Sequence, residues 1–254
     1  MVHYNRLRAD PSLALPPRTF LFAGKAAPAY HLAKLIIKLI TSIGRTVNRD
    51  PQMRDRLRVE FLPNYSVTLA EHLIPASDVS EQISTAGYEA SGTSNMKFMI
   101  NGAVTMGTRD GATIEIAEAV GEENCFLFGL TAQEVIESRG SYSPGWHYHN
   151  EPETHAALQL IFNNHFNHDE PGIFEPLREA LLSRGDPYMH LADLGPYVEA
   201  QRRLGVAYGD RSAWARMAIL NTARSGRFSS DRTIAEYARD IWRATACPVD
   251  GREP

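Results

Sequence analysis

The stretch Ser94-Asn-Met-Lys-Phe-Met-Ile-Asn-Gly-Ala-Val-Thr-Met-Gly107 contains two different patterns in succession. Residues 94–101 predict a short helix, and residues 104–107 form an apolar run that is typical of a buried strand. Helices that alternate with buried strands belong to βαβ units, whose strands lie parallel in one sheet. This stretch therefore favours an α/β fold, and the neighbouring sequence shows whether the alternation continues.

Short apolar runs on both sides of this stretch predict further strands. The run Thr-Phe-Leu-Phe-Ala at residues 19–23 is closed by Gly24, and the run at 58–62 is stopped by Pro63. We therefore predict a doubly wound parallel sheet within residues 1–140. The remaining strands are expected at residues 79–84 and 125–128, and the helices between strands at 30–47, 69–74 and 114–120.

The pattern changes after about residue 140. Residues 141–152 are rich in Ser, Pro, Gly and aromatic residues and predict a loop, whereas residues 1–10 suggest a polar chain that leads into a turn. Residues 141–254 are therefore predicted to be a helical C-terminal segment. Its helices are expected at 153–162, 174–183, 195–208, 212–222 and 231–242, and the last carries an apolar stripe of Ile234, Tyr237, Ala238, Ile241 and Trp242.

The composition limits the classes of function. The chain has 254 residues, is 43% hydrophobic and has a net charge of -4, which argues against a nucleic-acid partner because phosphate backbones attract basic proteins. Two cysteines are too few for a disulfide framework or a four-cysteine zinc site, so we expect no metal and a cytoplasmic setting. No apolar run is long enough to span a membrane.

The segment Ser84-Thr-Ala-Gly-Tyr-Glu-Ala-Ser-Gly-Thr-Ser-Asn-Met-Lys97 offers the clearest chemistry. Small hydroxyl residues and a glycine precede a helix, whose free N–H groups can bind a phosphate. Lys97 follows Thr93 by four residues and so lies on the same helix face. Its apolar neighbours predict burial, which would favour the neutral, imine-forming amine. Pyridoxal phosphate needs such a pair of features, but the residues alone favour an ordinary capped helix with a surface lysine.

A resemblance decides between these interpretations. The sequence Glu-Ala-Ser-Gly-Thr-x-Asn-Met-Lys resembles the pyridoxal-phosphate attachment motif of the α-glucan phosphorylases. The similarity runs from about Tyr4 to Trp242. Further segments that resemble this family in the same order are Gly24-Lys-Ala-Ala-Pro28, Asp55-Arg-Leu-Arg58, Ser80-Glu-Gln-Ile-Ser-Thr-Ala-Gly87, Asn101-Gly-Ala103, Gly121-Glu-Glu-Asn124 and Gly226-Arg-Phe-Ser-Ser-Asp-Arg-Thr-Ile-Ala235.

The resemblance implies a role for each motif residue. Lys97 would hold pyridoxal phosphate as an imine and be the catalytic position, with Thr93 and the turn at Gly92 seating the cofactor phosphate. Tyr65 would lie close to the cofactor, although Ser66 stands where some members carry an arginine. The residues implied to bind the glucosyl hydroxyls are Glu89, Ser91 and Gly92.

The resemblance also implies a reaction and partners. The cofactor phosphate would relay a proton to inorganic phosphate, which cleaves an α-glucan and yields α-glucose 1-phosphate with retention. The implied fold is the C-terminal Rossmann-like domain of GT-B glycosyltransferases, and full-length members are expected to be homodimers. The N-terminal domain and a basic phosphate-binding segment of that family are not recognised here. This chain alone is therefore expected to be inactive, with its last apolar stripe partly uncovered.

Two alternatives belong to other classes. A different pyridoxal-phosphate enzyme, such as an aminotransferase, would need a carboxylate for the pyridine nitrogen and an arginine for the substrate, and neither is identified. The other alternative is a noncatalytic Rossmann-like binding module, which would fail to bind a phosphate cofactor.

Overall fold

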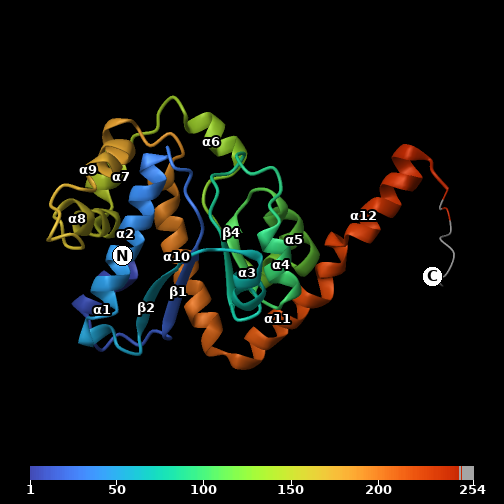
Figure 1. Cartoon of the computed structure of the whole chain (residues 1–254), viewed down its shortest axis with the longest axis horizontal. Coiled ribbons are helices and arrows are strands. Elements are labelled where there is room, and N and C mark those ends of the chain that lie inside the picture. The colour runs from blue at the N-terminus through green and yellow to red at the C-terminus, as the bar shows by residue number, and fades with distance from the viewer. Residues whose placement is uncertain (246, 248–254) are drawn as a thin grey trace.

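The computed structural model describes residues 1–245 and Cys247. Every strand ladder within these residues is parallel, and helices connect the strands, which confirms the predicted α/β class (Figure 1). Each predicted strand is present with small shifts at its ends. The strands are β1 (Arg18–Ala23), β2 (Leu57–Leu62), β3 (Val79–Gln82), β4 (Val104–Thr108) and β5 (Phe126–Phe128).

The helices alternate with the strands up to β5 and then follow one another. The first six are α1 (Val2–Ala9), α2 (His31–Val47), α3 (Val67–Leu73), α4 (Ser94–Ile100), α5 (Ala112–Val120) and α6 (Ala132–Ser138). The next six are α7 (Pro144–Asn150), α8 (Pro152–Phe162), α9 (Glu175–Arg178), α10 (His190–Gly209), α11 (Arg211–Arg224) and α12 (Ser230–Glu236). Two π-helical turns, Glu179–Ser183 and Tyr237–Trp242, extend α9 and α12. The short 3-10 turns are Pro51–Met53, Glu122–Asn124 and Ser225–Phe228.

The strands form two sheets, whereas one continuous sheet was expected. β1 pairs with β2, and β4 lies between β3 and β5. At the junction, side chains of α10 take the place of a backbone ladder. The Gln201 amide donates to the Glu81 carboxylate at 2.6 Å, and the Tyr197 hydroxyl donates to it at 2.8 Å. The guanidinium of Arg18 donates to the carbonyl of Gln201 at 2.7 Å, so these side chains connect β1 with β3.

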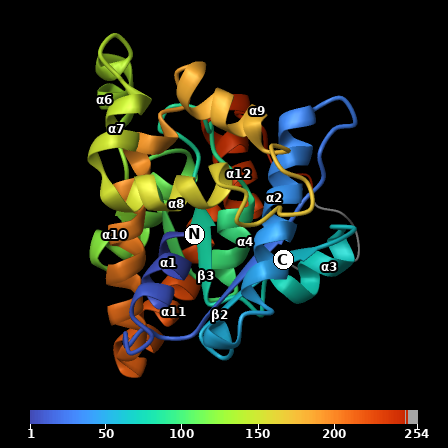
Figure 2. The ribbon, with the colours of Figure 1, turned by 90° about the vertical axis from the view of Figure 1, so that its left-hand side faces the viewer.

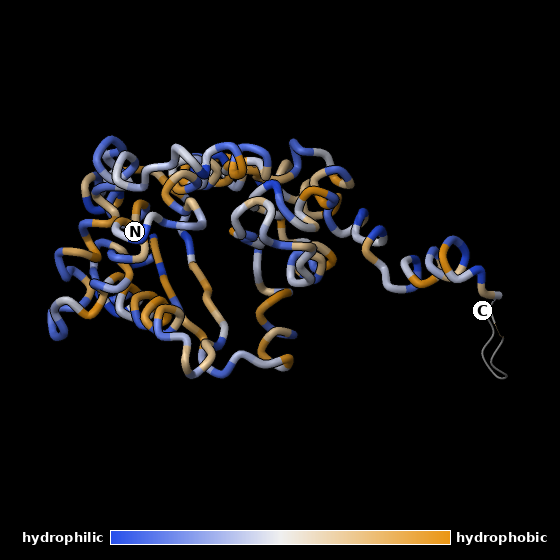
Figure 3. The backbone as a smooth tube through the Cα atoms, turned by 90° about the horizontal axis from the view of Figure 1, so that it is seen from above, coloured by the Kyte–Doolittle hydropathy of each residue, from blue (hydrophilic) through white to orange (hydrophobic). Residues whose placement is uncertain are grey.

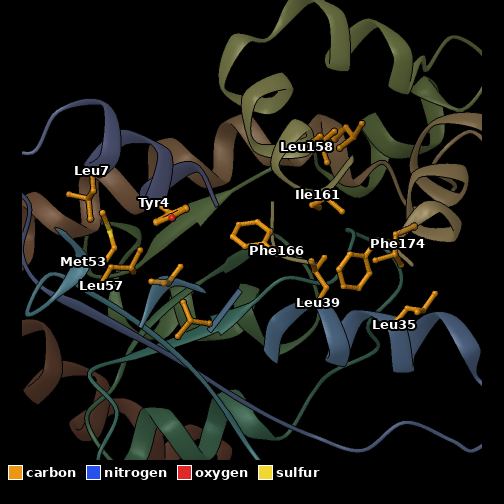
Figure 4. Packing of buried hydrophobic residues seen from close by; sticks show 14 residues of the cluster. Tyr4, Leu7, Leu35, Leu39, Met53, Leu57, Leu158, Ile161, Phe166 and Phe174 are labelled. Atoms are coloured by element: carbon orange, nitrogen blue, oxygen red, sulfur yellow. The ribbon is translucent and has the colours of Figure 1, made fainter. Parts of the chain in front are cut away.

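The prediction of a polar, turn-like N-terminus was wrong, because α1 is part of the main core. Tyr4 and Leu7 lie three residues apart on one face of α1, and both are buried. They pack in a cluster with residues of α2, β2 and α8, among them Leu39, Leu57 and Leu158 (Figure 4). Figure 2 shows α1 and α8 together on the side of the molecule that faces the viewer. The burial of Tyr4 and Leu7 is enough to hold α1 against this core, although α1 contains few apolar residues.

The prediction of a loop at residues 141–152 was also wrong, since α7 occupies most of this segment. The Ser143 hydroxyl accepts a hydrogen bond from the Trp146 amide at 3.2 Å, which caps the helix. Pro144 takes the first helical position, where a missing N–H group costs nothing. Ser143 and Pro144 are common in loops, but they are also suited to the first positions of a helix. Sequence patterns also missed α6, which begins with a capping box between Thr131 and Glu134.

A second packed region surrounds β4 and holds the motif segment in place. Val104 and Met106 of β4 are fully buried and pack with Phe126 and with Trp214 of α11. Beside them, Met99 of α4 packs with Ile116 and Val120 of α5. In Figure 1 the helices α4 and α5 lie next to β4, with α11 below them.

The last helix projects away from the rest of the molecule (Figures 1 and 3). The apolar stripe predicted for it is exposed: the exposed fractions are 53% for Ile234, 45% for Tyr237, 64% for Ile241 and 58% for Trp242. This agrees with the expectation that the stripe is partly uncovered. None of the helices in residues 1–245 combines the length and apolarity that crossing a membrane requires.

Candidate active site

The motif residues lie in one connection between a strand and a helix. The segment from residue 83 to residue 93 leaves the carboxyl end of β3 and leads into α4. It turns at Gly87 and Gly92, whose φ angles of 89° and 86° lie in the left-handed region that favours glycine. Ligands of parallel α/β proteins bind at the carboxyl ends of strands, so the position of this segment suits a binding site.

Lys97 and Thr93 occupy the same side of α4, as predicted. Thr93 caps the helix, and the Lys97 amide donates to the Thr93 carbonyl at 3.4 Å. Both side chains are exposed. On the opposite side, Asn95 and Met99 are buried, with exposed fractions of 2% and 0%. The helix therefore directs its apolar side inward and Lys97 outward.

The expected burial of Lys97 was wrong. Its neighbour Met99 turns into the core, while Ile100 is 57% exposed and does not cover the lysine. A helix turns about 100° per residue, so apolar residues that are adjacent in sequence point in different directions. The Lys97 side chain is consequently accessible from solvent.

The turn before α4 provides hydrogen-bond donors. The hydroxyl of Thr93 makes no capping bond to the helix, and the amides of Ser94 and Asn95 are among the first N–H groups of α4, which have no intrahelical acceptor. Gly92 brings the backbone close to the Asn95 side chain, since an added Cβ would lie 3.3 Å from the Asn95 amide nitrogen. A compact oxyanion or phosphate group suits these donors, and the Lys97 amine lies one helical turn away.

Glu89 and Ser91 are exposed beside this turn, and a neighbouring loop holds their backbone. The carboxylate of Asp110, which follows β4, accepts hydrogen bonds from the Gly87 amide at 2.9 Å and from the Glu89 amide at 2.7 Å. The Ser91 carbonyl accepts a bond from the Ala112 amide at 2.7 Å. Sequence reasoning missed Asp110. Its signal was an Asp-Gly pair directly after a predicted strand, where loops that form sites begin.

Tyr65 belongs to a different strand-to-helix connection from the other motif residues. It follows β2 in the other sheet and is 37% exposed. Among the described residues, no hydrogen bond joins Tyr65 to the segment from Glu89 to Lys97. Its neighbour Ser66 has a structural task, because its hydroxyl accepts a bond from the Leu69 amide at 3.3 Å and caps α3.

Other polar clusters and cavities do not involve the motif. Within residues 1–245 and Cys247, no group of three or more His, Cys, Asp or Glu side chains is placed to hold a metal ion. Two histidines form hydrogen bonds with residues close to them in sequence: His147 contacts Glu151 at 2.8 Å, and His155 contacts the Tyr148 carbonyl at 3.1 Å. An apolar cavity of about 300 Å³ lies between α1, α2, β1 and α10 and is lined by none of the motif residues.

Comparisons with known proteins place this arrangement in a family. The model of the carbohydrate phosphorylase family matches residues 1–244. The chain is 54% identical over 240 residues to a glycogen phosphorylase of Synechocystis, and these residues are 94% of the chain and 28% of that relative. It is 51% identical over 241 residues to the muscle form of glycogen phosphorylase from Oryctolagus cuniculus, again 94% of the chain and 28% of the relative.

A third relative extends the match. A glycogen phosphorylase of Chlamydia pneumoniae is 48% identical over 248 residues, which are 98% of the chain and 30% of that relative. The chain thus spans 28% to 30% of the length of these relatives. The comparisons support the phosphorylase interpretation and not the noncatalytic binding module. The chain belongs to the carbohydrate phosphorylase family.

Proposed function

We propose that this chain is the pyridoxal-phosphate-holding part of an α-1,4-glucan phosphorylase, which cleaves glycogen or maltodextrin with inorganic phosphate to yield α-glucose 1-phosphate. One observation carries the proposal: Glu89, Ser91 and Thr93 in the connection after β3, and Lys97 in the helix α4 that follows it, are all exposed. Membership of the carbohydrate phosphorylase family supports the reaction class. Because the chain spans about a third or less of its relatives, the reaction is proposed for the whole protein.

The donors and the amine in this connection fit the cofactor. The Lys97 amine would hold it, while the Thr93 hydroxyl and the amides at the start of α4 would bind its phosphate. When bound, pyridoxal phosphate would supply a phosphate group that relays a proton during phosphorolysis. Tyr65 is proposed as a further cofactor neighbour, on the strength of the family resemblance alone. The desolvation that would make the Lys97 amine more reactive is not provided by α4 itself.

The glucosyl unit is proposed to bind beside the cofactor. Glu89 and Ser91 are exposed and carry the acceptors and donors that sugar hydroxyl groups require, and Gly92 leaves its backbone open to a ligand. We assign Glu89 to substrate binding and not to acid catalysis or nucleophilic attack. A phosphorylase needs no pair of catalytic carboxylates, because phosphate is the attacking group.

The remaining parts of the proposal rest on the family resemblance, on the chain pattern and on the composition. They are a GT-B arrangement in which residues 1–140 form the Rossmann-like part and residues 141–254 the helical part, a cytoplasmic location, and a homodimeric full-length protein that binds neither nucleic acid nor membranes. The parallel strands of the first part and the helices of the second are consistent with that division.

The proposed binding site for the cofactor phosphate can be tested by comparing the affinities of the chain for two ligands. The chain is expected to bind pyridoxal phosphate at least about tenfold more tightly than pyridoxal, since only the former supplies a charged phosphate to the turn. Thr93→Val should reduce this preference severalfold. Thr41→Val removes a hydroxyl from the exposed side of α2 and should leave the preference unchanged. Equal affinity of the wild-type chain for both ligands would overturn the proposed binding site.

A further inference from the structure

The carboxylate of Asp110 is shared between two amides of the motif segment. Its two oxygens accept from Gly87 and Glu89, at 2.9 and 2.7 Å, so one side chain spans three consecutive backbone positions. Asp110 is 8% exposed, and its oxygens are therefore largely removed from competing water. Hydrogen bonds to an ionised acceptor are stronger than bonds between neutral groups, and they strengthen further when water is excluded.

Two more bonds join the same two loops and keep them in register, and a third ties the first loop to the chain before α10. The Thr108 hydroxyl donates to the Ser84 carbonyl at 2.6 Å, at the point where the two loops leave β3 and β4. The Ala112 amide donates to the Ser91 carbonyl at 2.7 Å, at the far end. The Thr85 hydroxyl donates to the Tyr188 carbonyl at 2.7 Å and ties the segment to the chain before α10. Asp110 therefore sits in the middle of a continuous row of contacts.

These loop contacts end before the residues of the proposed cofactor site begin. The contacts reach Ser84, Gly87, Glu89 and Ser91, while the exposed side chains of Thr93 and Lys97 belong to α4. The helix α4 has its own support, because Met99 packs on α5. The backbone that carries Glu89 and the helix that carries Lys97 are thus held by different interactions, and one can be loosened without the other.

We infer that Asp110 is a positioning residue for sugar recognition: its carboxylate fixes the backbone of residues 87–91 and so directs the Glu89 and Ser91 side chains toward the glucosyl unit. Asp110 itself does not touch the sugar or the cofactor. The inference rests on the proposed function, since it takes Glu89 and Ser91 to be the sugar-binding residues. It predicts that the Asp110 carboxylate controls sugar affinity and leaves cofactor affinity almost unchanged.

The variant Asp110→Asn tests this inference in the cofactor-loaded 254-residue chain. The amide keeps one oxygen but turns an NH₂ group toward one of the two backbone donors, so at least one bond is lost. Amide hydrogen exchange should become faster at Gly87 and Glu89, by about tenfold or more. The affinity for α-glucose 1-phosphate should fall by about tenfold or more, and the affinity for pyridoxal phosphate should change by less than about twofold.

A matched control separates positioning from a general loss of stability. Asp193 is 9% exposed, and it holds the loop after the neighbouring strand β5 by accepting a bond from the Leu130 amide at 2.8 Å. Asp193→Asn therefore replaces a buried bond to a carboxylate by a weaker bond to a neutral amide oxygen, in a loop without motif residues. It should lower thermal stability to a similar degree and leave the affinity for α-glucose 1-phosphate unchanged.

Three results would overturn the inference. The first is an Asp110→Asn chain that keeps wild-type amide exchange and wild-type sugar affinity. The second is an equal loss of sugar affinity in Asp110→Asn and Asp193→Asn. The third is a wild-type chain that does not bind α-glucose 1-phosphate, because no sugar site would then exist in it for Asp110 to position. Attachment of pyridoxal phosphate to Lys97 is measured separately, so the proposed function can stand where this inference fails.

Discussion

A Cβ atom on Gly111 would lie 2.5 Å from the carbonyl oxygen of Ser91. Gly111 has φ 49° and ψ -146°, a conformation that side chains rarely adopt. The next residue, Ala112, donates its amide to the same Ser91 oxygen at 2.7 Å. The backbones of the loops after β3 and β4 are therefore in direct contact, and glycine at position 111 makes this approach possible.

Replacing this glycine should separate the two loops. Gly111→Ala adds both a clash and backbone strain and is expected to lower the free energy of unfolding by about 2–4 kcal/mol. Urea unfolding measures the change. Gly140→Ala is the control, because its Cβ meets nothing within 4 Å, and it should shift stability by less than about 0.5 kcal/mol. Equal stability of both variants would contradict the close approach.

The packing of α4 can be tested with two adjacent residues. Met99 is fully buried and Ile100 is 57% exposed, so the same truncation should have different effects. Met99→Ala is expected to cost about 2–5 kcal/mol through the cavity it leaves, and Ile100→Ala less than about 1 kcal/mol. Chemical denaturation measures both. If Ile100→Ala proved the more damaging variant, the assignment of the inward side of α4 would be wrong.

The two cysteines should differ in reactivity. Burial raises the pKa of the Cys125 thiol to about 11, with a further contribution from the Glu122 carboxylate, whereas Cys247 is exposed. Because the thiolate is the reactive form, Cys247 should be alkylated first at pH 8, with Cys125 slower by about two orders of magnitude or more. Timed iodoacetamide labelling followed by peptide mass spectrometry gives both rates. Unfolding in urea should abolish the difference, and rapid labelling of native Cys125 would contradict its burial.

His3 should make stability depend on pH. Burial, followed by the charge of Arg18, lowers the pKa of His3 to about 4 from 6.5. Below pH 6.5 the unfolded chain takes up a proton that the folded chain resists, so stability is lost as the pH falls toward 4. At pH 4.5 the loss attributable to His3 is about 1–2 kcal/mol after allowance for its partial exposure.

A variant isolates this contribution. His3→Gln cannot titrate, so its unfolding free energy should fall less between pH 7 and pH 4.5 than that of the wild type. Carboxylates titrate in both proteins, so their contribution to the change in unfolding free energy cancels when the two proteins are compared. Parallel pH profiles of the two proteins would show that His3 is not held in its neutral form by the fold.

The strands β1 and β2 were predictable because each is an apolar run bounded by a breaker. The run before Gly24 became β1, and the run before Pro63 became β2. The separation into two sheets was not predictable, since it depends on Gln201 and Tyr197, which reach the junction from a distant helix. Local patterns carry no information on such long-range side-chain bonds.

The placement of the motif residues in the fold was predictable only in part. The motif located Lys97 and Thr93 on one helix face, because their spacing matches a helical turn. It did not reveal that Lys97 is exposed, since this depends on which side of α4 meets α5. Asp110 was missed for a similar reason: its hydrogen bonds join two loops that α4 and β4 separate in the sequence.

The most direct test of the central claim is to map where pyridoxal phosphate attaches to the chain. The chain has four lysines, Lys25, Lys34, Lys38 and Lys97, so borohydride reduction followed by peptide mass spectrometry distinguishes every candidate. We predict that the reduced cofactor is found on Lys97, that Lys97→Ala abolishes the labelling at an equimolar dose, and that Lys34→Ala does not. Labelling spread over the four lysines, or unchanged labelling of Lys97→Ala, would contradict the assignment of Lys97 as the cofactor lysine.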